Sequence, residues 1–131
     1  MLQGILFGIV TATILEPTGV DEVRLRAERK ADADVLSSLQ RNGDCSSIVR
    51  SIDLRFVGSK SSVLELSAAS TELGFTVTQS VRMADSEVAI DLAIQSDARA
   101  SSIDALTLTA LKIEKRFNLR YDGWGTVAKT C

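Results

Sequence analysis

Apolar residues recur in this chain with two different periods, and the order in which these periods follow one another limits the folds open to it. Between residues 48 and 57 the apolar side chains fall mainly at even positions. This alternation is typical of a strand with one buried face. Residues 88–95 alternate in the same way, residues 75–79 are short and β-prone, and residues 119–127 form a last extended segment. These segments predict four strands.

Three other segments show the apolar spacing of helices. Residues 21–40 carry balanced charges with a narrow apolar stripe, and the following Asn42-Gly43 is a usual C-terminal cap, so they predict a surface helix. A second helix is expected to begin at a capping box from Ser62 to Glu65 and to end at Gly74. The third, after Ser101, keeps an i+3, i+4 rhythm up to Phe117 and has cations in its last turns.

After the first helix the expected order is β-α-β-β-α-β, which predicts an α+β, ferredoxin-like sandwich with an additional N-terminal helix. Two helices would cover one face of a mainly antiparallel sheet, leaving the other face for the N-terminal helix or a partner. We expect residues 20–131 to form a single domain. Residues 1–19 are predicted to be an apolar arm or to come from a mis-assigned start. Their apolar run, residues 4–15, falls short of the about 20 apolar residues that a membrane-spanning helix needs.

The residue inventory argues against several chemistries. The chain has no histidine, which excludes Ser-His-Asp and Cys-His sites. Its two cysteines, Cys45 and Cys131, belong to no close-spaced ligand pair, so neither a metal site nor a disulfide framework is expected, and a reducing cytoplasm fits better. Fifteen basic and seventeen acidic residues leave a net charge of −2, which gives no general attraction to nucleic acid or to an anionic membrane.

Local motifs give no enzymatic or RNA-binding signature either. Gly58-Ser59-Lys60-Ser61 lacks the earlier glycine of a phosphate-binding loop and is better explained as a strand-to-helix turn. Asp53 and Asp91 lie out of phase with the apolar residues of their strands, so we expect them to face solvent. Phe56 is in phase with the inward set and unavailable for stacking on bases. We therefore expect no catalytic residues, no cofactor and no direct binding of nucleic acid.

The hexapeptide Tyr121-Asp122-Gly123-Trp124-Gly125-Thr126 combines the chain's only Tyr and only Trp with two glycines. Asp-Gly is a strong turn signal, and glycine permits positive φ or close approach of the backbone. Trp124 has two interpretations: an exposed anchor for a partner, or a residue that closes one end of the core together with Tyr121. We favour the second. Asp122 is expected to be a hydrogen-bonding residue at a turn or strand end, not an acid catalyst.

In this setting the hexapeptide resembles the family of regulators of ribonuclease E activity, type B (RraB-like). The stretch Leu73-Gly74-Phe75-Thr76-Val77-Thr78 is similar to the family's passage from helix to strand. The segment from Phe117 to Thr126 is similar to its passage into the last strand, and the helix ending in Asn42-Gly43-Asp44 to its opening helix. The resemblance covers residues 26 to 127. The members known best carry an acid-rich C-terminal tail, whereas this chain ends four residues after Val127.

The resemblance implies a small cytoplasmic protein without catalytic activity that binds ribonuclease E, notably its C-terminal scaffold region, and restrains its cleavage of RNA. The six hexapeptide residues would then serve the structure or the binding of the partner. An alternative of another class is a regulatory module of the same fold that binds a small molecule or oligomerises. The sequence leaves the oligomeric state open.

Overall fold

A computed structural model describes residues 19–131 of the chain. Residues 1–18, which make up nearly all of the expected apolar arm, lie outside the described residues. No helix within residues 19–131 has both the length and the apolar character needed to cross a bilayer.

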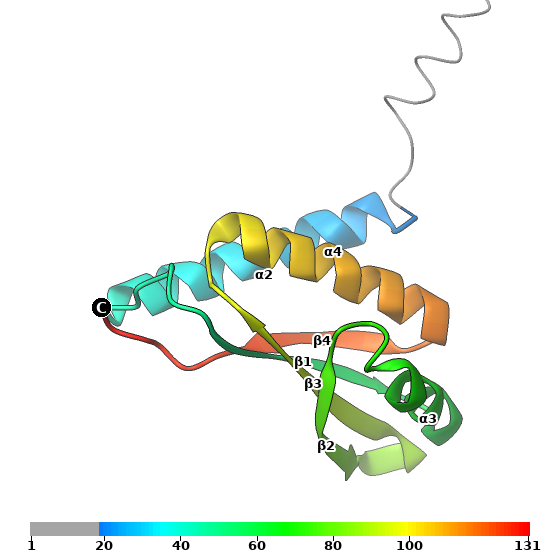
Figure 1. Cartoon of the computed structure of the whole chain (residues 1–131). Helices are drawn as coiled ribbons and strands as arrows, with labels where there is room; N and C mark the ends of the chain where they lie inside the picture. Colours follow the sequence, from blue (N-terminus) through cyan, green and yellow to red (C-terminus); the bar gives the residue numbers. More distant parts are fainter. Residues whose placement is uncertain (1–18) are drawn as a thin grey trace, which may run out of the picture.

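The described chain is an α+β sandwich built on a four-stranded antiparallel sheet of order β2-β3-β1-β4 (Figure 1). The elements in chain order are α2 (Glu22–Arg41), β1 (Arg50–Gly58), α3 (Lys60–Ala69), β2 (Thr76–Arg82), the short 3-10 helix η1 (Ala84–Ser86), β3 (Val88–Ser96), α4 (Ala100–Phe117) and β4 (Arg120–Gly125). This order and pairing confirm the predicted ferredoxin-like arrangement with an additional N-terminal helix.

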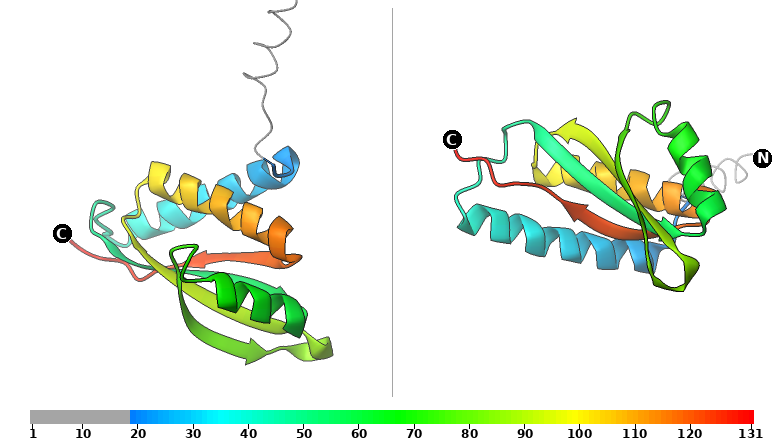
Figure 2. Two further views of the ribbon diagram at one scale, coloured as in Figure 1. Left: turned by 45° about the vertical axis from the view of Figure 1, so that its right-hand side comes forward. Right: turned by 90° about the horizontal axis from the view of Figure 1, so that it is seen from below.

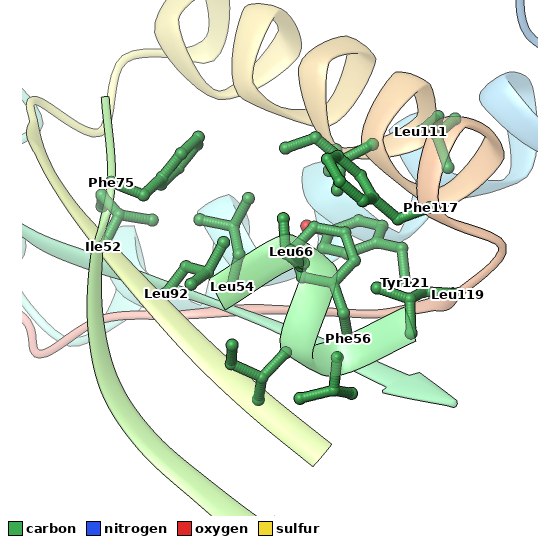
Figure 3. Packing of buried hydrophobic residues seen from close by; sticks show 14 of the residues in the cluster. Ile52, Leu54, Phe56, Leu66, Phe75, Leu92, Leu111, Phe117, Leu119 and Tyr121 are labelled. Atoms are coloured by element: carbon green, nitrogen blue, oxygen red, sulfur yellow. The ribbon is translucent and has the colours of Figure 1, made fainter. Parts of the chain in front are cut away.

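One face of the sheet carries the hydrophobic core. Ile52, Leu54 and Phe56 of β1 are fully buried, and the β3 residues opposite them in register are apolar as well. Leu66 of α3 and Phe117 of α4 join the same cluster, so both helices pack on this face (Figure 3). The even-position alternation in β1 therefore marks its inward face, as predicted.

The N-terminal helix α2 lies beside α4 and along β4, not across the opposite face of the sheet (Figure 2). Its contacts with these elements include two hydrogen bonds that Asp32 accepts, one from Thr107 of α4 and one from Trp124 of β4. In the right-hand view of Figure 2, β1 and β4 lie in front of α4, with α2 alongside β4. Of the two occupants expected for the other sheet face, α2 is thus excluded.

Two helix starts differ from the prediction. Helix α3 begins at Lys60, because Ser59 is its N-cap and accepts a hydrogen bond from the Ser62 backbone N–H at 3.2 Å. Ser59, and not the predicted Ser62, is the N-cap, because its backbone is extended, as an N-cap requires, whereas Ser62 already lies inside the helix. Helix α4 begins at Ala100, and its N-cap Arg99 makes no side-chain cap bond.

The expectation that the two cysteines form no disulfide framework is wrong: Cys45 and Cys131 form a disulfide. The C-terminal segment runs back beside the loop between α2 and β1, where the Cys45 N–H donates to the Lys129 carbonyl at 2.6 Å. The Lys129 N–H in turn donates to Asp44 Oδ1 at 2.8 Å. A separation of 86 residues gives no local signal for this pairing, and the cysteine argument for a reducing compartment no longer holds.

Candidate functional site

Five residues of the hexapeptide, Tyr121 to Gly125, lie in edge strand β4, and they contain a β-bulge. Tyr121 and Trp124 pair with β1 residues only two positions apart, so that Asp122 and Gly123 together lie opposite Arg55. Gly123 has a φ of 96°, a conformation that glycine adopts without steric cost. Because side chains alternate between the faces of a strand, the extra residue returns Trp124 to the same face as Tyr121.

Trp124 is half-buried, and its indole is hydrogen-bonded to a buried carboxylate, that of Asp32. Its Nε1–H donates to Asp32 Oδ1 at 2.8 Å, and the Thr107 hydroxyl donates to Asp32 Oδ2 at 2.6 Å. Asp32 is only 6% exposed. Burial raises the pKa of the Asp32 carboxyl above its ordinary value, while the hydrogen bonds from Thr107 and Trp124 oppose this rise. One carboxylate thus ties together α2, α4 and β4.

The Tyr121 side chain is buried, and its backbone N–H and C=O, which lie on the free edge of β4, are hydrogen-bonded to side chains. Its ring packs against Phe56 with centroids 5.3 Å apart, and burial strongly raises the pKa of its phenol. Its N–H donates to Glu114 Oε2 at 2.7 Å, and its carbonyl accepts from Arg24 Nη2 at 3.0 Å. Arg24 and Glu114 also pair at 2.8 Å. An ion pair therefore takes up edge-strand groups that would otherwise be free to pair with another chain.

The face of the sheet opposite the core is polar and hollowed. The hollow has a volume of about 570 Å³, and its lining residues come from all four strands and from no helix. Its polar side chains include Asp53 and Arg55 of β1, Gln79 of β2, Asp91 of β3 and Asp122 of β4. We call this surface the open face.

Within the open face one pair of charges is fixed. Arg55 Nε and Nη2 donate to the two carboxylate oxygens of Asp91 at 2.8 and 2.9 Å. The pKa of the guanidinium is raised by this hydrogen-bonded contact with Asp91. The prediction that Asp53 and Asp91 face away from the core is confirmed: Asp53 is exposed, and Asp91 is half-buried under Arg55.

Asp122, Gly125 and Thr126 of the hexapeptide each lie in a different environment. Asp122 is exposed at the hollow, and Gly125 pairs with Asp53 in register. Thr126 donates its hydroxyl to the Ser51 carbonyl at 2.8 Å and so anchors the chain beyond β4. The geometry of Trp124 agrees with the interpretation that it closes one end of the core.

Sequence reasoning missed Asp32, Thr107, Arg24 and Glu114 as partners of the hexapeptide. For Asp32 a signal existed: it lies seven residues after Leu25 and four before Leu36, on the inward stripe of α2. For Thr107, Arg24 and Glu114 the sequence has no such signal, because their contacts form only when the helices pack against β4. Within the described part of the chain, no group of three or more His, Cys, Asp or Glu side chains could hold a metal ion.

The fold and these contacts define a class of protein: a ferredoxin-like α+β domain with an extra N-terminal helix. Its last strand is hydrogen-bonded to this helix, and the sheet face opposite the core is polar. Within this class, residues 29–126 match the family described as regulator of ribonuclease activity B, RraB. The match spans most of the chain, and the chain therefore belongs to the RraB family. The comparison with curated proteins finds no match.

Proposed function

We propose that this chain is a non-enzymatic protein that binds ribonuclease E and lowers the rate at which it cleaves RNA. The observation that carries the proposal is the family match over residues 29–126, since the family is described by its regulation of ribonuclease activity. The residue inventory supports a binding role, because the chain has no histidine to act as a general base.

The electrostatics of the hexapeptide region also support a role in binding more than in catalysis. Asp32 is buried and accepts two hydrogen bonds, and Glu114 is occupied by Arg24 and by the Tyr121 N–H. Such carboxylates hold elements together and have no free access to a substrate. Regulation would then act through contact with the nuclease protein, and transcripts would be affected indirectly.

The test is a pull-down with purified ribonuclease E from the same organism, using the oxidised chain as bait. The expected result is stoichiometric capture that survives nuclease treatment of the sample, because RNA does not bridge the two proteins. Failure to capture the enzyme, or capture that disappears when RNA is digested, contradicts the proposal.

A second candidate, a module that binds a small molecule, is favoured by one observation: the hollow of about 570 Å³ that reaches Trp124. A ligand there would raise the thermal stability of the chain, because it would bind the folded state alone. A thermal-shift screen against metabolites would support this candidate if it gave a hit while ribonuclease E failed to bind.

A further inference from the structure

Within residues 19–131, no helix or loop covers the open face of the sheet. Alternation in β1 places Asp53 and Arg55 on the side away from the buried Leu54. The hollow on this side receives lining residues from the four strands alone, and α2, α3 and α4 contribute to the other side (Figure 2). A partner can therefore reach the whole width of the sheet here.

The charges of this face are unbalanced. Arg55 is committed to Asp91 through two hydrogen bonds, which leaves Asp53 and Asp122 as the remaining charged groups at the hollow. Both side chains are exposed, and neither makes a hydrogen bond or an ion pair within the described residues. Arg55 also attracts Asp122, but one guanidinium among three carboxylates leaves the hollow with a net negative charge, which attracts cations and repels the phosphates of RNA.

The hollow also continues along the sheet. A second hollow of about 360 Å³ shares Asp53 and Gly125 with the first and extends to Val127 and Lys129 of the C-terminal segment, where the positive charge of Lys129 confines the negative region to the first hollow. Gly125 keeps the passage free of a side chain, and nothing lies within 4 Å of where its Cβ would be. The Cys45–Cys131 disulfide holds the far wall in place. A depression of this form suits an extended segment better than a compact ligand.

We propose that the open face binds an extended, basic segment of a partner protein, with Asp53 and Asp122 pairing with its Arg or Lys side chains. Arginine fits best, because its planar guanidinium can engage a carboxylate through two parallel hydrogen bonds, as Arg55 already does with Asp91. The inference rests on the proposed function, in which the partner is ribonuclease E, and it names the surface and the chemistry of that contact.

The first experiment compares the oxidised native chain with the double variant Asp53→Asn and Asp122→Asn for binding to ribonuclease E by calorimetry. The matched control changes Asp34 and Asp85, two exposed aspartates away from the hollow, to Asn. We expect the open-face variant to bind roughly three- to thirtyfold more weakly and with less salt dependence, because exposed charge pairs each contribute modestly. The control variant should bind as the native chain does.

A second experiment separates the inference from the proposed function. A synthetic twelve-residue peptide with alternating arginines, its glutamate counterpart and a single-stranded RNA of similar length are titrated into the native chain, with calorimetry as the readout. The expected result is binding of the arginine peptide alone, weakened in the open-face variant and unchanged in the control.

The outcomes are distinct. If ribonuclease E fails to bind while the arginine peptide binds through Asp53 and Asp122, the proposed function fails and the assignment of the surface stands. If ribonuclease E binds the open-face variant as tightly as the native chain, the inference is overturned and the proposed function stands. Absence of arginine-peptide binding, or binding of RNA in its place, also overturns the inference.

Discussion

Replacing Gly123 by alanine tests whether the bulge in β4 depends on backbone conformation alone. Gly123 has a φ of 96°, and no atom lies within 4 Å of the position that a Cβ would take. The added methyl group therefore meets no neighbour, and the expected loss comes from forcing an L-residue into a left-handed conformation. This costs about 1–2 kcal/mol. Gly125 is the matched control, since its surroundings are equally empty and its φ is not in the left-handed range.

Both substitutions reduce the freedom of the unfolded chain by the same amount, which alone would stabilise each variant by about 0.4–1 kcal/mol. The difference between them isolates the conformational cost. We expect Gly123→Ala to have a free energy of unfolding about 1–2 kcal/mol below that of Gly125→Ala. From the entropy of unfolding per residue, this difference corresponds to roughly 4–7 °C in Tm for a domain of this size.

The assay is urea unfolding of both oxidised variants, followed by the fluorescence of Trp124. Circular dichroism of the folded proteins provides the control that each keeps its secondary structure. Equal unfolding midpoints for the two variants, or a more stable Gly123→Ala, would show that the bulge does not impose the backbone conformation on which the position of Trp124 rests.

Two further predictions concern the contacts that join distant parts of the chain. Burial raises the pKa of Asp32, so its stabilising contribution is full below the ordinary value of 3.8 and is lost as the pH rises through the raised pKa. Urea unfolding at several pH values should therefore show Asp32→Asn gaining stability relative to the native chain as the pH rises, and parallel profiles would contradict this. Cys131→Ser removes a cross-link between residues 86 positions apart. The chain-entropy model gives a loss of about 4–5 kcal/mol, and equal urea midpoints for the variant and the oxidised native chain would refute it.

Periodicity predicted most of the architecture, because the physical cause of each element is local. The alternation around Leu54 and Phe56 reflects one buried face of β1, and the i+3, i+4 rhythm of α4 reflects one buried side. Both patterns are visible without knowing what they pack against. The hexapeptide was equally informative, since Asp-Gly predicted a special backbone, and Gly123 has one.

Contacts between residues distant in the sequence could not be predicted in this way. Cys45 and Cys131 meet only because the segment after β4 returns to the loop that follows α2. Asp32 becomes a binding partner of Trp124 only after α2 has packed along β4, which fixes both residues. The charge balance of the open face likewise depends on Arg55 being committed to Asp91 across two strands. These pairings follow from topology, which local patterns constrain only indirectly.

The most direct test of the regulatory role is the rate at which purified ribonuclease E from the same organism cleaves a labelled RNA while the oxidised chain is titrated into the reaction. An unrelated endoribonuclease serves as the control for sequestration of the substrate. We predict a saturable fall in the rate of ribonuclease E at concentrations where the two proteins bind, with no effect on the control enzyme. An unchanged rate of ribonuclease E at saturating concentrations of the chain, or an equal fall for both enzymes, would contradict the account.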